Sequence, residues 1–368
     1  MVSRIHYIGI LRSPVSWAKV NREFVLALDR AGLEVSVTEL RGLHYDGDYP
    51  LTERLEELVE RPRDASIEMG MEYPQNLWKL DGDLNLAWVL YETDLPPDWA
   101  ASYREHADVF ICPSSFVERK AVEAGLPAER TFTVPFGVNT DHYHPEVEAE
   151  RSDTSDLRIL AVGPPHKRKG FRELIRGYVD AFAREEAIQL HIKTYDRASE
   201  DQLYPWEFDL DGFIKEKTGP HAPVMEVDRT ARDEQEMARL FKGADVFILP
   251  SYGEAFGLSV LESMAVGTPV IGVDYGPVPG MVNQHNGWLL DCTESALSGV
   301  AYDVEQPCTF CVPSDDEIGR LLRELYDQPE RIRERQEAAI RTAGEWTWDH
   351  SAERFTEVLQ ALDETSAL

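Results

Sequence analysis

The stretch that decides the fold class is RIHYIGILRSPVSWAKVNREFVLALDRAGLEVSVTEL, residues 4–40. Its apolar run at 4–10 is typical of a strand, and the apolar residues of 17–32 recur at helical spacing. Gly32 ends this helical pattern, as glycine often does at a helix C-terminus. A second strand pattern follows at 33–40. A strand, a helix and a strand in this order predict a parallel sheet.

The same order of elements returns in the second half of the chain. The segment EVEAERSDTSD, residues 146–156, is polar, acidic and without periodicity, which is typical of a linker. Strand and helix patterns then alternate at 157–163, 170–186, 188–195, 234–244 and 245–251. We therefore expect an α/β protein with two doubly wound, Rossmann-like domains facing a central cleft. Ligands are expected outside the carboxyl ends of the strands. The expected bounds are 1–145, a linker at 146–156, 157–346, and a terminal helix in 347–368.

The charge of the chain narrows the range of partners. Its 368 residues include 37 Lys and Arg against 67 Asp and Glu, a net charge of −30, and only nine residues are lysine. An acid surplus with scarce lysine resembles proteins of salt-accumulating halophiles, in which carboxylates keep the surface hydrated. The alternative is an acidic protein of a mesophile. In both cases a nucleic-acid partner is disfavoured, because the basic surface that such partners require is lacking.

The location of the protein is predicted from two absences in the sequence. No run of 18 apolar residues exists, so no membrane-spanning helix is expected, although peripheral membrane contact stays open. Residues 1–17 have no small-residue cleavage site and are predicted to begin the first strand rather than a signal peptide. With four cysteines the chain has too few for a disulfide scaffold, and a cytoplasmic location is expected.

Three cysteines lie close together in the sequence. Cys308 and Cys311 form the motif CTFC, and Cys292 lies upstream. A structural zinc site usually has four ligands, and no fourth follows at suitable spacing. We expect free thiols in a surface loop, with no metal and with their role left open. The acidic motif DGD at 81–83 is interpreted as a turn.

Two glutamates with seven residues between them occur in SYGEAFGLSVLESMAVGTPVI, residues 251–271. Glu262 lies on the apolar face of an expected helix, where an unpaired carboxylate is costly. The alternatives are a surface or capping residue, and a receptor for adjacent ligand hydroxyls, since two carboxylate oxygens can accept both protons of a diol. Glu254 precedes the turn that opens this helix. Backbone N–H groups of Phe256, Gly257 and Leu258 would there form an anion site.

These motifs resemble the retaining glycosyltransferases of family 4, the glycosyl transferases group 1, which have the two-domain GT-B fold. The two glutamates and the following GTPVI resemble the family's donor-site signature. LAVGPPHKRKGFRELIRGY, residues 160–178, resembles its phosphate-binding strand, loop and helix. YETDLPPDW, DVFICPSSF, VPFGVNTDHYHP, NGWLL and EWTWDHSAERFTEVL occur in the family's order, so that the resemblance covers nearly the whole chain.

The resemblance implies a role for each donor-site residue. Glu262 would hold the ribose hydroxyls and Glu254 the hydroxyls of the transferred sugar. Phe256, Gly257 and Leu258 would present N–H groups to the donor. The domain at 157–346 would therefore bind a nucleotide sugar and the domain at 1–145 the acceptor. The last helix would pack back toward the first domain.

The phosphate-binding loop departs from the family pattern. Its Gly163 and Lys169 are implied as donor contacts, but Pro164 stands where the family usually has an arginine. Arg168 is the candidate for the missing charge, because its planar guanidinium can bridge two phosphates. The alternative is that Lys167, Arg168 and Lys169 are surface charges of a loop.

On the acceptor side, Trp17, Glu92 and Asp94 are the candidates. Trp17 follows the first strand, in a loop without the family's usual glycine pair. Glu92 and Asp94 follow a later strand, where helix capping is the alternative explanation.

The expected function is transfer of a hexose-type sugar, with retention, from a nucleotide diphosphate sugar to a hydroxyl of a glycan, lipid-linked or small-molecule acceptor. No cofactor or metal is expected, because the departing phosphate can take the acceptor proton. Glu254, Lys169 and Arg168 would act in catalysis. The alternatives are a non-catalytic sugar-nucleotide-binding protein, or a phosphorylase or epimerase on the same fold.

The acid surplus predicts that stability rises with salt. The Debye screening length is ~30 Å at 0.01 M salt and ~3 Å at 1 M. In dilute buffer, like charges therefore repel one another over longer distances. We expect the melting temperature to rise between 0.01 M and 1 M KCl. A melting temperature that is flat or falls over this range would contradict the halophilic interpretation.

Overall fold

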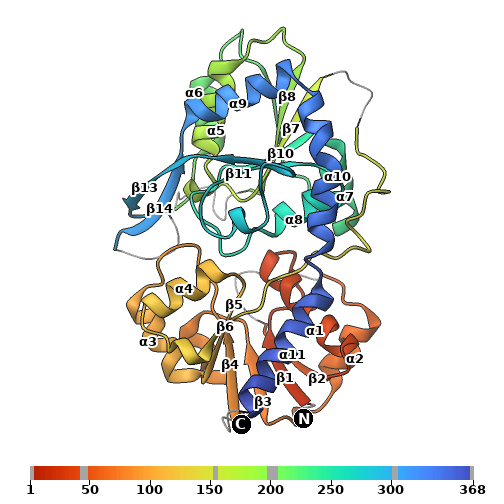
Figure 1. Cartoon of the computed structure of the whole chain (residues 1–368), viewed down its shortest axis with the longest axis vertical. Helices are drawn as coiled ribbons and strands as arrows, with labels where there is room; N and C mark the ends of the chain where they lie inside the picture. Colours follow the sequence, from red (N-terminus) through yellow and green to blue (C-terminus); the bar gives the residue numbers. More distant parts are fainter. Residues whose placement is uncertain (1–3, 42–48, 152–155, 197–205, 301–305, 365–368) are drawn as a thin grey trace. The chain divides into compact units, whose positions relative to one another are not determined.

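The computed structural model describes residues 4–41, 49–151, 156–196, 206–300 and 306–364. The chain divides into two compact units (Figure 1). The first unit comprises Met1–Gly137 together with Trp346–Leu368, and the second comprises Val138–Glu345. The chain therefore leaves the first unit eight residues before the expected bound of 145 (145 − 137 = 8). Among the described residues, no helix is both long and apolar enough to cross a membrane.

The first unit contains a six-stranded sheet in the order β2-β1-β3-β4-β5-β6, with neighbouring strands parallel. Its strands are β1 (Arg4–Gly9), β2 (Glu34–Glu39), β3 (Ile67–Gly70), β4 (Leu84–Trp88), β5 (Val109–Cys112) and β6 (Thr131–Thr133). Its helices are α1 (Ser16–Arg30), α2 (Glu53–Glu60), α3 (Pro97–His106), α4 (Ser115–Glu123) and α11 (Trp348–Glu364), with the 3₁₀ helices η1 (Pro74–Lys79) and η2 (Ala128–Arg130).

The last helix completes the core of the first unit. Phe24 of α1 packs edge-on against Trp88 of β4, with ring centroids 5.2 Å apart, and against Phe355 of α11 at 5.4 Å. All three rings are fully buried. Gly137 allows the return of the chain, because a Cβ at this position would lie 2.2 Å from the backbone nitrogen of Trp348. The helix that is most distant in sequence is thus part of this core.

The second unit contains another parallel six-stranded sheet, in the order β12-β11-β10-β7-β8-β9. Its strands are β7 (Leu157–Val162), β8 (Ile188–Lys193), β9 (Val224–Asp228), β10 (Val246–Leu249), β11 (Val270–Val273) and β12 (Gly287–Leu290). Helices α5 (Phe171–Ala181), α6 (Leu210–Lys217) and α9 (Asp315–Asp327) pack together, as do α7 (Glu234–Gly243), α8 (Leu258–Ala265) and α10 (Glu330–Gly344). Short 3₁₀ helices are η3 (Lys167–Lys169) and η4 (Val278–Gly280).

The predicted fold class is confirmed, since both units have parallel sheets with helices. The terminal helix expected within 347–368 is α11, which ends at Glu364. Helices α2 and α10 and strands β3 and β9 were not predicted. Strand β9 has partly exposed residues at alternate positions because it lies at the edge of its sheet. Its sequence therefore lacks the apolar run that marks the central strands.

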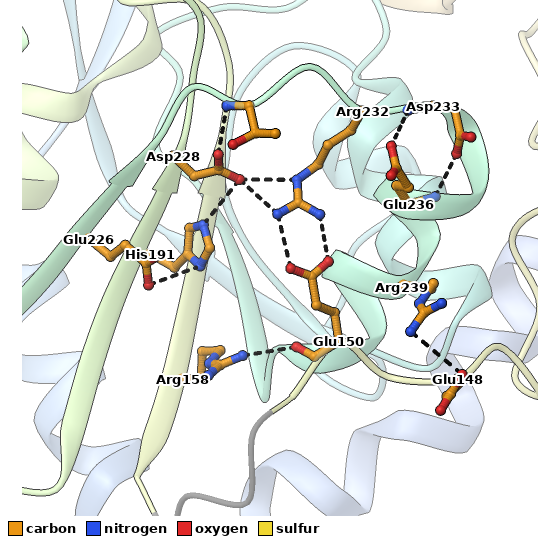
Figure 2. A network of polar contacts seen from close by, with 11 residues as sticks. Glu148, Glu150, Arg158, His191, Glu226, Asp228, Arg232, Asp233, Glu236 and Arg239 are labelled. Atoms are coloured by element: carbon orange, nitrogen blue, oxygen red, sulfur yellow. Dashed lines mark hydrogen bonds and ion pairs between the residues drawn. The ribbon is translucent and has the colours of Figure 1, made fainter.

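The segment expected as a linker is bound to the second unit through Glu150 (Figure 2). Arg232 makes a two-pronged contact with the carboxylate of Glu150, at 2.5 and 3.0 Å, and also binds Asp228 at 2.9 Å. Arg158 donates to the backbone carbonyl of Glu150 at 3.0 Å. The His191 imidazole lies 3.7 Å from Asp228, and burial lowers its pKa despite the neighbouring carboxylates. Residues 152–155 of the expected linker lie outside the described residues.

The expectation of free thiols is wrong for two of the three cysteines. Strands β13 (Cys292–Leu297) and β14 (Cys308–Pro313) form an antiparallel pair, in which Cys292 and Cys311 form a disulfide with Cα atoms 5.4 Å apart. Cys308 is buried and does not take part in this disulfide. It packs in a small apolar cluster with Tyr252 and Phe310. The disulfide could not be predicted from the spacing of the cysteines, because the antiparallel pairing of β13 and β14 is what brings the two thiols together.

Removal of the Phe355 ring tests the contribution of α11 to the first unit. Phe355→Ala deletes a fully buried ring, which typically costs about 3–5 kcal/mol of unfolding free energy. We expect a loss of this size in denaturant unfolding, with Glu353→Ala on the exposed face of α11 as the control. Equal stability of the two variants would contradict the assignment of α11 to this core.

Candidate active site

Two loops of the second unit meet where the strand order reverses. The chain runs outward from β7 to β8 and β9, and then returns to the other side of β7 as β10. The loops that follow β7 and β10 therefore lie next to each other at the carboxyl edge of the sheet. Parallel α/β sheets bind ligands at such a switch point. The expected donor residues 163–169 and 254–258 lie on these loops and at the start of α8.

An ion pair joins the two loops. The Lys169 Nζ donates to Glu254 Oε1 at 2.5 Å, and Arg168 lies 3.2 Å from the same carboxylate oxygen. Burial alone would raise the pKa of Glu254, but the charges of Lys169 and Arg168 outweigh burial and lower its pKa to about 2. The structure thus brings together three residues that the sequence separates by up to 86 positions (254 − 168 = 86). Glu254 is ionised at neutral pH.

Arg168 also holds the β10 loop in place. Its guanidinium donates to the Gly253 carbonyl at 2.7 Å, and its own carbonyl accepts from the Tyr252 N–H at 2.8 Å. The side chain is buried, whereas Lys169 is half-buried and Lys167 exposed. Of the three adjacent cations, Arg168 is therefore the one built into the loop. The alternative explanation, that the three cations are surface charges of a loop, therefore does not hold for Arg168.

Glycines make room for these contacts. Gly170 has φ +66°, and a Cβ there would lie 2.0 Å from the Pro250 carbonyl oxygen, so the two loops can approach only with glycine at this position. A Cβ at Gly163 would lie 3.3 Å from the Lys169 side chain. Lys169 therefore crosses directly over Gly163 to reach Glu254.

Helix α8 begins beside the ion pair. Its N-cap residue is Gly257, with φ +96°, which has no side chain to cap the first turn. Phe256 is buried in the turn, and Leu258 is the first helical residue. Glu262 is only 8% exposed, as its place on the apolar face of the sequence pattern indicated. The start of α8 thus combines a helix N-terminus with a buried carboxylate one turn further along.

Two polar residues around this site were not predicted from the sequence. Tyr143 donates to Glu234 at 2.8 Å, and burial together with the negative charges of Glu262 and Glu234 raises its pKa. Burial and the nearby charges of Arg168 and Lys169 lower the pKa of His166 to about 4, so this imidazole is neutral at pH 7. The position of His166 within the basic PPHKRKG loop was the available signal. Tyr143 lies in the VPFGVNTDHYHP stretch, but that stretch gives no sign of its contact with Glu234, which belongs to another element.

The β13–β14 pair supports the loop of Glu254 from another direction. The Cys311 N–H donates to the Tyr252 carbonyl at 2.9 Å, and Tyr252 packs with Phe310. The Tyr252 hydroxyl donates to the buried Glu173 of α5, whose pKa is raised by burial. Tyr252, two residues before Glu254, is thus held by three neighbouring elements.

The acceptor-side candidates lie in the first unit, at the carboxyl edge of its own sheet. Trp17 is in the first turn of α1, with its ring centroid 5.1 Å from that of Tyr73. Asp94 is ion-paired with Lys120 at 2.8 Å. Glu92 lies in the same loop after β4 and is half-buried. In the described part of the chain, no group of three or more His, Cys, Asp or Glu side chains is arranged to hold a metal.

Comparison with solved structures shows the class of fold. The chain superposes over 99% of its length on all of the sucrose-phosphate synthase of Thermosynechococcus elongatus, with a TM-score of 0.75 and 16% identity. It matches Anabaena HepE in complex with UDP-glucose over 98% of the chain and 100% of that protein, with a TM-score of 0.70 and 13% identity. The predicted GT-B fold is thus confirmed.

Sequence comparison supports a relationship to one family. Residues 227–301, which include Glu254 and Glu262, match the family model of the glycosyl transferases group 1. The D-inositol 3-phosphate glycosyltransferase of Thermobispora bispora is 31% identical over 34% of this chain and 25% of its own length. The enzyme of the same name from Corynebacterium aurimucosum is 26% identical over 69% of this chain and 57% of its length. The chain thus spans between a quarter and just over half of these two relatives.

The ion pair predicts a pH-dependent effect of Glu254→Gln. Because the folded-state pKa of Glu254 is depressed to about 2 from 4.5, its stabilisation is present above pH 4.5 and is lost as pH falls toward 2. Removing one partner of a buried pair typically costs about 3–5 kcal/mol. We expect the variant to be less stable than the parent at pH 7, and this difference to shrink between pH 4.5 and 3. The measurement is the unfolding free energy in constant salt.

The exposed Glu337→Gln on α10 is the matched control, because its side chain is 90% exposed. A difference between the parent and Glu254→Gln that is unchanged from pH 7 to pH 3 would contradict the role of the Glu254 charge.

Proposed function

We propose that this chain is a retaining glycosyltransferase that moves a hexose-type sugar from a nucleotide diphosphate sugar to an acceptor hydroxyl. The observation that carries this proposal is the Lys169–Glu254 ion pair, which lies at the switch point of the second unit beside the start of α8. It places a cation, a helix N-terminus and two carboxylates along one edge of a sheet. A nucleotide diphosphate sugar offers the matching groups in a row: sugar hydroxyls, two phosphates and a ribose diol.

In this proposal each group of the donor has its own receptor. Glu262 accepts hydrogen bonds from the two ribose hydroxyls, which offsets the cost of its burial. The N–H groups at Phe256, Gly257 and Leu258, with the α8 dipole, face the diphosphate. Lys169, which is paired with Glu254, contacts the diphosphate. Glu254 itself accepts hydrogen bonds from hydroxyls of the transferred sugar.

Arg168 has a double role in the proposal. Its guanidinium is tied to Gly253 and lies near Glu254, so it positions the carboxylate. Its positive charge lies next to that of Lys169. It thereby takes the place of the family's usual arginine charge, which is missing here because Pro164 stands at that position. Gly163 leaves the space over which Lys169 reaches the donor.

The chemistry follows from these charges. The bond from the anomeric carbon to the phosphate oxygen breaks, and negative charge grows on the departing nucleoside diphosphate. Lys169, Arg168 and the start of α8 stabilise that charge, and they do so most in the transition state. The acceptor oxygen attacks from the face that the phosphate leaves, and its proton passes to the departing phosphate oxygen. The configuration is retained, and neither a protein base nor a resident metal is required for the step.

The comparisons support a sugar-nucleotide donor. The similar HepE structures were determined with UDP, UDP-glucose and UDP with glucose. The T. bispora and C. aurimucosum relatives are named as glycosyltransferases of D-inositol 3-phosphate. We extend the donor class to this chain, with a glycan, lipid-linked or small-molecule hydroxyl as acceptor.

The test is incubation of the full chain in molar KCl with UDP-, GDP- and ADP-sugars and a panel of acceptor glycosides. The proposal expects release of nucleoside diphosphate that depends on the acceptor, and a product whose anomeric proton coupling in NMR matches that of the donor. Tight donor binding without turnover would indicate a non-catalytic sugar-nucleotide-binding protein. Turnover that requires phosphate and no nucleotide would indicate a phosphorylase.

Glu262→Ala is expected to weaken nucleotide binding more than any other single change in α8. Loss of a charge-assisted hydrogen-bond acceptor is worth about 1.5–3 kcal/mol, or roughly a tenfold to hundredfold rise in Kd. Calorimetry with the nucleoside diphosphate that binds the parent measures the change. Glu337→Ala on α10 is the control. An unchanged Kd in Glu262→Ala would show that the ribose assignment is wrong.

A further inference from the structure

Four aromatic rings form a continuous cluster in the first unit. The ring centroids of Trp17 and Tyr73 are 5.1 Å apart, those of Tyr73 and Trp99 5.8 Å, and those of Trp99 and Tyr91 5.1 Å. We call these four residues the aromatic cluster. Tyr91 is buried, whereas Trp17, Tyr73 and Trp99 are each half-buried. These contacts join a helix start, two strand ends and a second helix.

The aromatic cluster lies at the switch point of the first sheet. Strand β1 is followed by β2 on one side, and β3 then pairs with the other side of β1. Trp17 follows β1 and Tyr73 follows β3, so their contact crosses the point where the strand order reverses. In open parallel sheets this is where ligands bind. The second unit uses the equivalent place for its Lys169–Glu254 pair.

A buried carboxylate adjoins the aromatic cluster. Glu72 directly precedes Tyr73 and is only 5% exposed. Its Oε1 accepts from the Tyr73 N–H at 2.8 Å, whereas its Oε2 is buried without a hydrogen-bond partner among the described residues. Burial raises the pKa of Tyr103, and the charge of Glu72 adds to the effect. Since Tyr103 lies one turn after Trp99 in α3, Glu72 is close to the inner side of the aromatic cluster.

An unpartnered buried carboxylate oxygen is costly, and a donor from a ligand removes the cost. Partly exposed aromatic residues that adjoin such a carboxylate match a pyranose. The C–H face of a pyranose is apolar and packs on aromatic rings, while its edge carries hydroxyl donors.

The charges at this edge are unfavourable for an anion. Arg12, after β1, is paired with Glu56 at 2.5 Å and with Glu39 at 3.4 Å. Lys120 is paired with Asp94 at 2.8 Å and with Glu123 at 3.0 Å. Arg22 of α1, a third cation beside the end of β1, donates to the Leu11 and Ser13 carbonyls at 2.5 and 2.8 Å. Arg12 and Lys120 are thus paired with carboxylates, Arg22 is bound to backbone carbonyls, and the Glu72 carboxylate would repel a phosphate.

We infer that the aromatic cluster with Glu72 binds the acceptor, and that this acceptor is a neutral, unphosphorylated hexopyranoside. Its apolar face packs on Trp17, Tyr73 and Trp99, and one of its hydroxyls donates to Glu72 Oε2. The role as acceptor rests on the proposed function. Binding of the glycoside itself does not, because the aromatic cluster lies wholly within the first unit.

The test measures glycoside binding by the full chain, with and without UDP. The probes are the methyl α-D-pyranosides of glucose, galactose and mannose, compared with glucose 6-phosphate, galactose 6-phosphate and mannose 6-phosphate, by saturation-transfer NMR. We expect saturable binding of at least one glycoside and binding at least tenfold weaker for the corresponding phosphate. Absence of saturable binding by all three glycosides, or tighter binding of a phosphate, overturns the inference.

Variants locate the binding site. Trp17→Ala, Trp99→Ala and Glu72→Gln are each expected to weaken glycoside binding at least tenfold. Glu72→Gln nearly keeps the shape of the side chain and keeps an oxygen that can accept the hydrogen bond from the Tyr73 N–H. Weaker glycoside binding in this variant would therefore report loss of the Oε2 contact rather than unfolding. Trp78→Ala is the matched control, because Trp78 is 65% exposed and makes no ring contact with the aromatic cluster. Equal effects of Trp17→Ala and Trp78→Ala overturn the inference.

Nucleotide binding separates failure of this inference from failure of the proposed function. If the parent binds no nucleoside diphosphate but does bind a glycoside at Trp17, the donor proposal fails and the glycoside site stands. If the parent binds a nucleoside diphosphate and transfers sugar, while Trp17→Ala, Trp99→Ala and Glu72→Gln leave the acceptor KM unchanged, the aromatic cluster is not the acceptor site.

Discussion

The contact of Arg168 and Lys169 with the carboxylate of Glu254 is the interaction on which the second unit's site depends. It joins the loops after β7 and β10, which only the reversal of strand order makes neighbours. The Glu254 side chain is only 11% exposed, so its charge would be costly without two cations beside it. Each cation would in turn repel the other without the carboxylate. The loops therefore assemble as one charged unit, and Gly170 permits the close approach that this requires.

Surrounding elements reinforce this unit without contributing charge to it. Tyr252, two residues before Glu254, is fixed by Arg168, by the β13–β14 pair and by Glu173 of α5. The disulfide between Cys292 and Cys311 ties the two strands of that pair to each other. The proposed role of Glu254 in orienting a sugar would require that it be held to within a fraction of an ångström, and several elements converge on its short loop.

The two units use the same architectural position for different chemistry. At the switch point of the second unit lie cations, a helix N-terminus and acidic side chains, which suit a diphosphate and hydroxyls. At the switch point of the first unit lie aromatic rings and a buried carboxylate, which suit a neutral pyranose. A parallel sheet provides the position, and the residues that follow each strand decide what is bound there. This division is also what a transfer between two chemically unlike substrates requires.

The sequence by itself determined the α/β class, most central strands, the terminal helix and the residues of the ion pair. Central parallel strands are continuous apolar runs, and Glu254, Glu262 and Lys169 stand in short local motifs that carry their own signal. Edge strand β9, helices α2 and α10, the Cys292–Cys311 bridge and the surroundings of Tyr143 and Glu72 were decided only by the tertiary structure. Their partners come from distant parts of the chain. A contact between distant residues leaves no pattern in either local sequence, because strand order and pairing, rather than spacing, bring the two residues together.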